Sequence, residues 1–379
     1  MAHKCRVAWN GASVDAQWRR EADHLVVTTV DGVPMSLPLG EVSGIGGDGF
    51  GIVLRSLQGD MRLERLGADG PTLLQELRRD WPPLRAKLLR LSDGTAVSKV
   101  FTGYVQGPQR AGPFRGFLAH DRFIHAIDGE DVTALQLADC RSVSFDESAF
   151  SIRCPGWADG AGTMFSKLGG ETAALVDLLR KARGQLAAEA DISLGRHLPS
   201  LAPGARANLA AHWLPGRMLS FAELEGLAPG FETAFLASWL AHSHRDEEGR
   251  SLMNGVSAAD RWLGYGRVGR TLAPQDSGDD VPQLLWLLVR GDPNWSLELL
   301  SQGDYATYLF SGGDEVPGLI GGLVRFPEFS REALYMPLTD LVDERARYAV
   351  AARELPLLRD LRERFAGRRI HAPRSRPAN

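Results

Sequence analysis

The first half of this sequence carries the same pattern twice. Residues 23–79 align with residues 121–180, and each copy opens with an Asp followed by a short apolar run. An alternating segment follows, from Leu37 in the first copy and from Leu135 in the second. Because a repeated sequence folds into a repeated unit, the structure of one copy decides the fold of the whole first half.

Each copy combines two periodicities. Apolar residues first recur at every second position, which indicates strands with one buried face, and Asp31-Gly32 indicates a tight turn between two of them. A basic residue, a Leu and a Gly then precede a segment whose leucines recur every three or four residues, which is typical of an amphipathic helix. The pattern predicts a β-rich module closed by a C-terminal helix, over residues 1–92 and again over 96–189.

This strand pattern with its terminal helix resembles the pleckstrin-homology-like (PH-like) superfold, which includes the bacterial PH-like and GRAM-type domains. The resemblance covers residues 1–190 and implies an α+β protein in which two tandem PH-like modules form β-sandwiches or barrels, each capped by a helix. Known members bind phosphoinositides, peptides or proteins and rarely catalyse a reaction. In the lipid-binding members, basic residues cluster in the loop between the first two strands. The matching candidates here are Arg19 and Arg20 in the first copy and Arg110 and Arg115 in the second.

Beyond residue 190 the spacing becomes helical. Ser220 and Glu223 have the spacing of a capping box, which marks the start of a helix. We expect a small helical unit over residues 190–270, followed by a linker over 271–282 in which Pro, Gly, Ser and Asp are frequent.

A C-terminal α+β domain is predicted over residues 282–373. Residues 284–289 are apolar without interruption, as in a buried strand, and alternation follows from Trp295. A helix is expected to begin at Pro356, because Pro favours the first helical position. The polar tail from Ala372 is expected to be disordered. An alternative is that this domain is a third, diverged copy of the repeated module.

Two segments have the glycine spacing of a dinucleotide site, but neither has the flanking elements that such a site requires. A strand must precede the glycines and a helix must follow, so that the helix N-terminus faces the pyrophosphate. A strand-like segment follows the first set and a helical segment precedes the second, so we expect a strand-to-strand turn and a loop or hinge. The sets are Gly44, Gly46 and Gly49, and Gly264, Gly266 and Gly269, with Arg267 and Arg270 of the second as candidate anion contacts.

We expect no metal and no cofactor. His242 and His244, followed by acidic residues, come nearest to a metal-ligand cluster, but side chains two positions apart on a helix point to different faces. The sequence contains no GxSxG, P-loop or HExxH motif. Cys140 and Cys154 fall on repeat strands, and Cys140 aligns with the apolar Val42, so both thiols are expected to be buried.

Two further features favour contacts with other molecules. Trp157 lies in a loop inserted only in the second copy, and it either forms an exposed contact or packs against its own module. Basic residues follow both predicted helices, where they either complement the dipole at the helix C-terminus or form a shared surface for an anion. These residues are Arg78, Arg79, Arg180 and Lys181.

The composition bears on location and on ligand class. Only three cysteines occur, none of them in a CxxC pair, which fits a reducing compartment. Residues 1–6 are not followed by the apolar core of a signal peptide, and no stretch approaches the roughly 18 apolar residues of a membrane helix. A net charge of −4 argues against a surface devoted to nucleic acid. We expect a cytoplasmic, bacterial protein that does not bind nucleic acid.

The combined pattern predicts a non-catalytic adaptor or scaffold that binds a protein partner through its tandem modules. Two linked modules gain effective concentration when both engage one partner. One alternative is peripheral binding to a membrane or an anionic lipid. A second alternative is an enzyme with its site in the C-terminal domain, for which Asp304, Arg331 and Glu332 are the titratable candidates.

Overall fold

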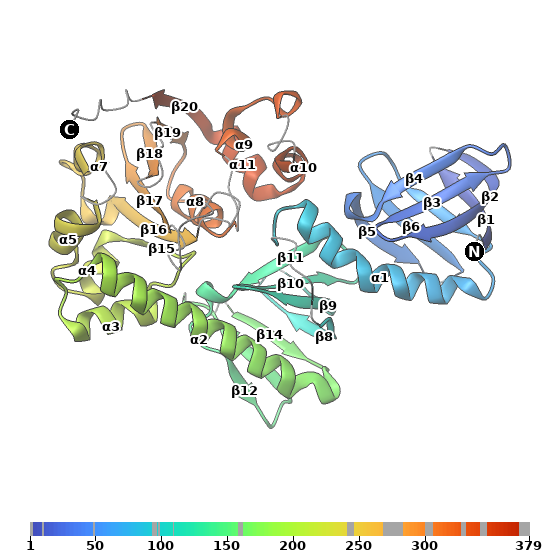
Figure 1. The fold of residues 1–379 in the computed structure, drawn as a ribbon, viewed down its shortest axis with the longest axis horizontal. Helices are drawn as coiled ribbons and strands as arrows, with labels where there is room; N and C mark the ends of the chain where they lie inside the picture. Colours follow the sequence, from blue (N-terminus) through green and yellow to red (C-terminus); the bar gives the residue numbers. More distant parts are fainter. Residues whose placement is uncertain are drawn as a thin grey trace, which may run out of the picture. The chain divides into compact units, whose positions relative to one another are not determined.

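The chain divides into two compact units, Met1–Ala182 and Arg183–Asn379 (Figure 1). Both units combine helices with an antiparallel sheet, which confirms the predicted α+β class. The computed structural model describes residues 3–9, 11–47, 50–92, 97, 99–108, 110–157, 162–240, 246–267, 283–299, 306–326, 331–341 and 347–370.

The first module is a seven-stranded antiparallel sheet followed by a long helix. Its strands lie in the order β4-β3-β2-β1-β7-β6-β5, so the chain runs from the middle outward to one edge at β4, crosses to the opposite edge at β5 and returns to the middle at β7. The elements are β1 (His3–Trp9), β2 (Ala12–Glu21), β3 (His24–Thr29), β4 (Pro34–Pro38), β5 (Val42–Gly47), β6 (Gly51–Ser56), β7 (Met61–Glu64) and α1 (Asp69–Leu88).

The second module has the same architecture, strand for strand. Its order, β11-β10-β9-β8-β14-β13-β12, is the first order with every label raised by seven, and this confirms the repeat. The elements are β8 (Phe101–Gln106), β9 (Ala111–Ala119), β10 (Arg122–Ile127), β11 (Val132–Gln136), β12 (Ser144–Asp146), β13 (Ser151–Pro155), β14 (Gly162–Ser166) and α2 (Thr172–His197).

The shared step before each helix has a conformational cause. Gly67 and Gly169 both have φ near +58°, which glycine adopts without the steric cost that a Cβ brings. The basic residues two positions earlier, Arg65 and Lys167, also have positive φ, at 57° and 55°. The chain therefore turns through the same left-handed geometry in both copies before the helix begins.

The helices bury the leucines that the sequence assigned to them. Leu77 of α1 and Leu179 of α2 are both 0% exposed, and they pack over the open side of their sheets. Cys140 and Cys154 are each 1% exposed, which confirms that these thiols are buried. Apolar side chains that line both the sheet and the helix thus form one core for each module.

The core of the second module contains a histidine. His125 lies on β10 among the rings of Phe114, Phe123 and Phe165, whose centroids are 6.0 to 6.2 Å from its own. Its Nδ1 atom is buried and has no hydrogen-bond partner. Burial therefore lowers the pKa of His125 from its ordinary value of 6.5 to about 4.

We expect His125 to make the protein less stable in acid. Between pH 6.5 and about pH 4, the unfolded chain binds a proton at this position and the folded chain does not, so stability falls as the pH drops through this window. The linkage predicts a loss of about 2 kcal/mol between pH 7.5 and pH 5. In the His125→Phe variant this part of the loss should disappear, as measured by chemical unfolding at both pH values. An equal acid dependence in the variant would contradict the assignment.

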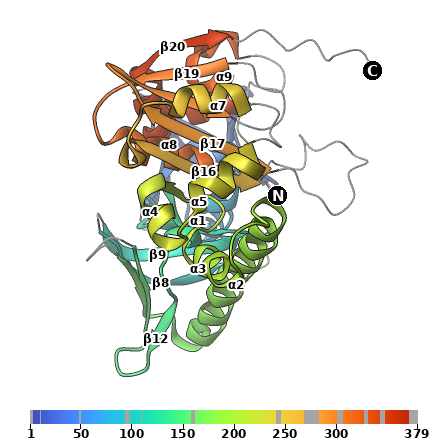
Figure 2. The ribbon, with the colours of Figure 1, turned by 90° about the vertical axis from the view of Figure 1, so that its left-hand side faces the viewer.

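The C-terminal unit contains a third sheet, and Figure 2 shows its strands following one another from β16 to β20. The order is β15-β16-β17-β18-β19-β20, with every neighbouring pair antiparallel. The strands are β15 (Met218–Ser220), β16 (Arg261–Arg267), β17 (Gln283–Arg290), β18 (Asn294–Leu299), β19 (Ala306–Ser311) and β20 (Phe365–Ile370).

Helices precede this sheet in the chain and lie between its strands. They are α3 (Pro203–His212), α4 (Phe221–Leu227), α5 (Phe231–Ala234), α7 (Asp246–Met253), α8 (Val316–Val324), α9 (Glu332–Tyr335), α10 (Arg347–Glu354) and α11 (Pro356–Arg364). Ser220 caps α4 in a capping box with Glu223, and α11 begins at Pro356, so both predicted helix starts are confirmed. No helix in the described ranges has the length and apolar composition needed to cross a bilayer.

The sheet crosses the boundary that the sequence predicted within the second half. Residues 190–270 were expected to form a helical unit, but β15 and β16 lie in the same sheet as the strands of residues 282–373. The simple meander order also differs from that of the repeated modules, so the alternative of a third copy is wrong. The predicted linker over 271–282 and the tail from Ala372 lie outside the described residues.

Both glycine sets were expected to form turns or loops, and both contribute to strands instead. Gly264 and Gly266 lie in β16, where added Cβ atoms would stand 2.6 Å from Met218 Cγ and 3.0 Å from the Val324 carbonyl oxygen. Glycine therefore allows β15 and α8 to approach this strand closely. Gly44 and Gly46 lie in β5. Gly49 and Gly269 are outside the described residues.

Candidate binding cleft between the two N-terminal modules

The two modules of the N-terminal unit meet through a hairpin tip. Helix α1 of the first module packs against β9, β10 and β11 of the second. The turn between β10 and β11 reaches β5 of the first module, where the Ile45 N–H donates a hydrogen bond to the Gly129 carbonyl oxygen at 2.7 Å. One module thus holds a piece of the other by a backbone contact.

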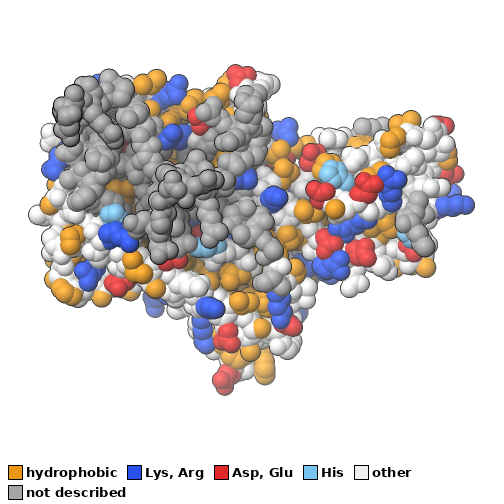
Figure 3. All heavy atoms as spheres, viewed as in Figure 1, with side chains coloured by type: hydrophobic (Ala, Val, Ile, Leu, Met, Phe, Trp, Pro, Cys, Tyr) orange, Lys and Arg blue, Asp and Glu red, His pale blue; other side chains and the backbone are white. Residues whose placement is uncertain are grey.

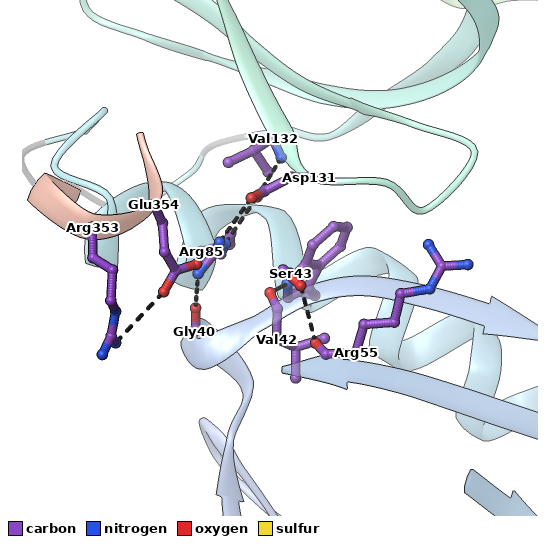
Figure 4. Close-up of polar contacts among 10 residues, drawn as sticks. Gly40, Val42, Ser43, Arg55, Arg85, Asp131, Val132, Arg353 and Glu354 are labelled. Carbon is purple, nitrogen blue, oxygen red and sulfur yellow. Dashed lines mark hydrogen bonds and ion pairs between the residues drawn. The ribbon is translucent and has the colours of Figure 1, made fainter. Parts of the chain in front are cut away.

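An ion pair between a buried arginine and a half-exposed aspartate reinforces this contact (Figure 4). Arg85 of α1 is 0% exposed, and its Nε and Nη2 atoms donate to the two carboxylate oxygens of Asp131 at 2.9 and 2.7 Å. Its Nη1 atom donates to the Gly40 carbonyl oxygen at 3.2 Å. A bidentate pair fixes the direction as well as the distance of the two groups, so it sets how the modules dock.

Glycine is required at the tip itself. Gly129 has φ of +73°, and an added Cβ would lie 2.2 Å from the Ile45 carbonyl oxygen. The glycine of the corresponding turn in the first module, Gly32, lies one position later in that turn; it has φ of +79°, but a Cβ there would meet no atom within 4 Å. The same turn is therefore a docking element in one module and a free tip in the other.

Two adjoining hollows lie along this junction. The smaller, about 330 Å³, is walled by α1 and by the first three strands of the second module. The larger, about 820 Å³, extends toward the end of β2. Thr102 and Arg115 line both hollows, so they mark the point where the two spaces join.

Most of the charged groups in the larger hollow are paired. Asp80 accepts from Arg79 at 2.6 Å and from Arg20 at 2.9 Å, and these partners, Arg79 foremost, hold the pKa of the Asp80 carboxyl below its usual value. Lys99 forms an ion pair with Glu171 and lies over the ring of Phe101. These cations already have their counter-charges within the protein.

Arg115 differs from these cations. Its side chain lies in β9, half-buried, and it forms no hydrogen bond or ion pair with any residue that the structure describes. Burial, with the nearby charges of Arg78 and Arg79, lowers the pKa of Arg115 from its ordinary value. The Nη2 atom of Arg78 donates a hydrogen bond to the Gly47 carbonyl oxygen at 3.3 Å, while its Nε atom is buried without a hydrogen-bond partner.

The structure separates the basic residues that the sequence grouped together. Arg20 and Arg115 line the same hollow, whereas Arg19 pairs with Glu21 at 2.6 Å and Arg110 with Glu130 at 2.5 Å. Of the four predicted loop arginines, only Arg110 lies in the loop between the first two strands of its module; Arg19 and Arg20 lie in β2 and Arg115 in β9. The expected pair of basic loops is therefore wrong, and only Arg20 and Arg115 of the four lie at the junction.

Trp157 packs against its own module. Its side chain is half-buried, and its Nε1 atom donates to the Ala138 carbonyl oxygen at 2.9 Å. The equivalent carbonyl of the first module, that of Gly40, receives Arg85. The inserted loop of the second copy thus satisfies the backbone group that the buried arginine satisfies in the first.

Several other candidates lie in the C-terminal unit or outside the described residues. Arg267 lies in β16, and Arg331 and Glu332 lie at the start of α9. His242, His244, Arg270 and Asp304 fall outside the described residues. Within the described ranges, no three His, Cys, Asp or Glu side chains gather in a way that could hold a metal ion.

The docking pair itself was not predicted from the sequence. The only signal lies in the repeat: the tip that docks reads Asp128-Gly129-Glu130-Asp131, whereas the corresponding positions of the free tip read Val30-Asp31-Gly32-Val33. An acidic tip in one copy alone could have indicated a basic partner. Arg85, far from it in the chain, carries no mark that distinguishes it from a solvated helix cation.

Comparison with known proteins gives this chain no relatives: no family model and no curated protein matches it. The cleft must therefore be interpreted from its own residues.

Proposed function

We propose that this protein is a non-catalytic adaptor in which two PH-like modules act together as one recognition unit for a protein partner. The supporting observation is the cleft at their junction, whose walls come from both modules. The Arg85–Asp131 pair and the Gly129 contact hold those walls in register. A partner that fits this cleft would engage both modules at once, without the entropic cost of bringing them together.

The charge of the cleft favours a protein segment over a membrane surface. Five cations face three carboxylates across the two hollows: Arg20, Arg78, Arg79, Lys99 and Arg115 against Asp23, Asp80 and Asp128. A phosphoinositide headgroup carries several phosphates and needs a larger excess of cations. On the part of the first module visible in Figure 3, basic and acidic side chains are interspersed, as in surfaces that bind proteins by matched pairs.

Affinity purification of the tagged full-length protein from its own host tests this proposal. We expect mass spectrometry to find a stoichiometric partner that survives moderate salt. The Gly129→Ala variant should lose most of this partner, because the new Cβ would collide with the Ile45 carbonyl and undock the modules. Gly32→Ala is the matched control, since it carries the same positive φ without a collision.

Two outcomes would overturn the proposal. A purification that yields no stoichiometric partner would argue against an adaptor. Equal recovery by Gly129→Ala and wild type, with the undocking verified by limited proteolysis between residues 89 and 100, would show that the modules need not act as one unit.

A further inference from the structure

The two hollows differ in whether their charges are already satisfied. In the larger one, Arg20 and Arg79 share Asp80. In the smaller one, Arg78 and Arg115 face a single carboxylate among the described lining residues, that of Asp128, which forms no ion pair in the described chain. The smaller hollow therefore holds two cations and one carboxylate, and neither cation forms an ion pair with a residue that the structure describes.

We infer that the smaller hollow binds one anionic group, a carboxylate or a phosphate, between Arg115 and Arg78. This inference rests on the proposed function, because it supplies the chemistry by which the partner segment would be recognised.

The geometry supports a specific site over a diffuse basic surface. Arg115 projects from a strand and Arg78 from a helix, so both side chains start from rigid elements. The guanidinium group is planar and presents its donors as a fork that matches two oxygens of a carboxylate or phosphate. Thr102, which lines the same hollow, adds a hydroxyl that can donate a further hydrogen bond.

Keeping two like charges close together costs free energy unless an anion joins them. Arg115 lies half-buried beside Arg78 and Arg79, and its burial, together with their charges, lowers the pKa of Arg115. A ligand anion would remove that repulsion and supply the missing hydrogen-bond acceptors, so binding would stabilise the docked modules as well. A hollow of about 330 Å³ has room for one such group on a peptide side chain.

Calorimetric titration of the full-length protein with inorganic phosphate and with an acetylated tetraglutamate peptide tests this site. We expect saturable binding that weakens as salt is added. Arg115→Gln should weaken binding at least tenfold, because it removes a charged fork from the hollow. Asp128→Asn should strengthen it severalfold, because it removes the competing carboxylate; Asn also tolerates the positive φ of 52° at this position.

Arg153→Gln is the matched control. Arg153 lies on β13, away from both hollows, and is 58% exposed with Asp146 as its partner. This variant should bind both probes as wild type does. Equal affinity of wild type and Arg115→Gln, or the absence of saturable binding, would overturn the inference.

The source of the anion is settled by comparing probes. Preference for the glutamate peptide indicates a carboxylate, and preference for phosphate indicates a phosphorylated group. If phosphatidylserine vesicles bind the wild-type protein but not Arg115→Gln, and neither soluble probe binds, the ligand of this site would be a lipid surface and not a protein segment. If the host partner is retained by Arg115→Gln but lost by Gly129→Ala, the anion site is wrong and the adaptor proposal stands.

Discussion

Replacing Trp81 by Ala is expected to lower the free energy of unfolding by about 4 kcal/mol. Trp81 is 1% exposed in α1, at the wall of the smaller hollow, so its removal leaves a large cavity in the junction between the modules. The indole Nε1 also donates to the Val42 carbonyl oxygen at 2.7 Å, and the variant leaves that buried acceptor without its donor. Chemical unfolding followed by circular dichroism measures the loss.

Trp157→Ala is the matched comparison for this effect. Trp157 also donates its indole N–H to a backbone carbonyl, but its side chain is only half-buried. We expect the free energy of unfolding to fall by about 1 to 2 kcal/mol, because the half-buried indole buries less apolar surface than that of Trp81. A loss equal to that of Trp81→Ala would show that the inserted loop contributes as much to the core as the helix does.

The sequence after Trp81 also breaks a rule for predicting where helices end. Trp81 is followed by Pro82 and Pro83, which lack the N–H that a helix interior uses, and a propensity rule would end the helix before them. Helix α1 nevertheless continues to Leu88. Trp81, Pro82, Arg85 and Ala86 are all buried, so packing between the two modules compensates for the missing hydrogen bonds.

The repeat could be predicted because it depends on local periodicity. Strand alternation, the Gly67 and Gly169 steps and the helical leucines each follow from a few neighbouring residues, and comparing the copies reinforced every one of them. In β16 the same method failed, because Gly264 and Gly266 interrupt the alternation that marks a strand. Their role is to admit Met218 and Val324, which are distant in sequence.

The cleft was only partly predictable for the same reason. Arg115 was recognised as a candidate because the resemblance assigned it to the loop between the first two strands of the second copy, but this assignment was wrong: it lies in β9, at the junction. Arg78 was noted because basic residues occur at the same place in both copies. What brings these residues together is the docking of one hairpin tip on another module, and that contact depends on shapes that no single segment encodes.

Asp131→Ala tests this docking directly, and we expect it to lower the free energy of unfolding by about 3 kcal/mol. Arg85 is fully buried, and the variant removes the carboxylate that accepts two of its donors. The expected loss is at the lower end of the range for buried pairs, because the Asp131 side chain is 40% exposed and water can partly replace it. Chemical unfolding of the full-length protein measures this loss.

A double-mutant cycle separates the ion pair from the packing. Arg85→Met keeps most of the buried volume and removes the charge, so the double variant with Asp131→Ala no longer buries a cation that has lost this carboxylate. We expect the sum of the unfolding free energies lost by the two single variants to exceed the loss in the double variant by at least 1 kcal/mol. Strict additivity would mean that Arg85 and Asp131 do not stabilise each other, and that the Gly129 backbone contact and the apolar wall around Trp81 hold the modules together.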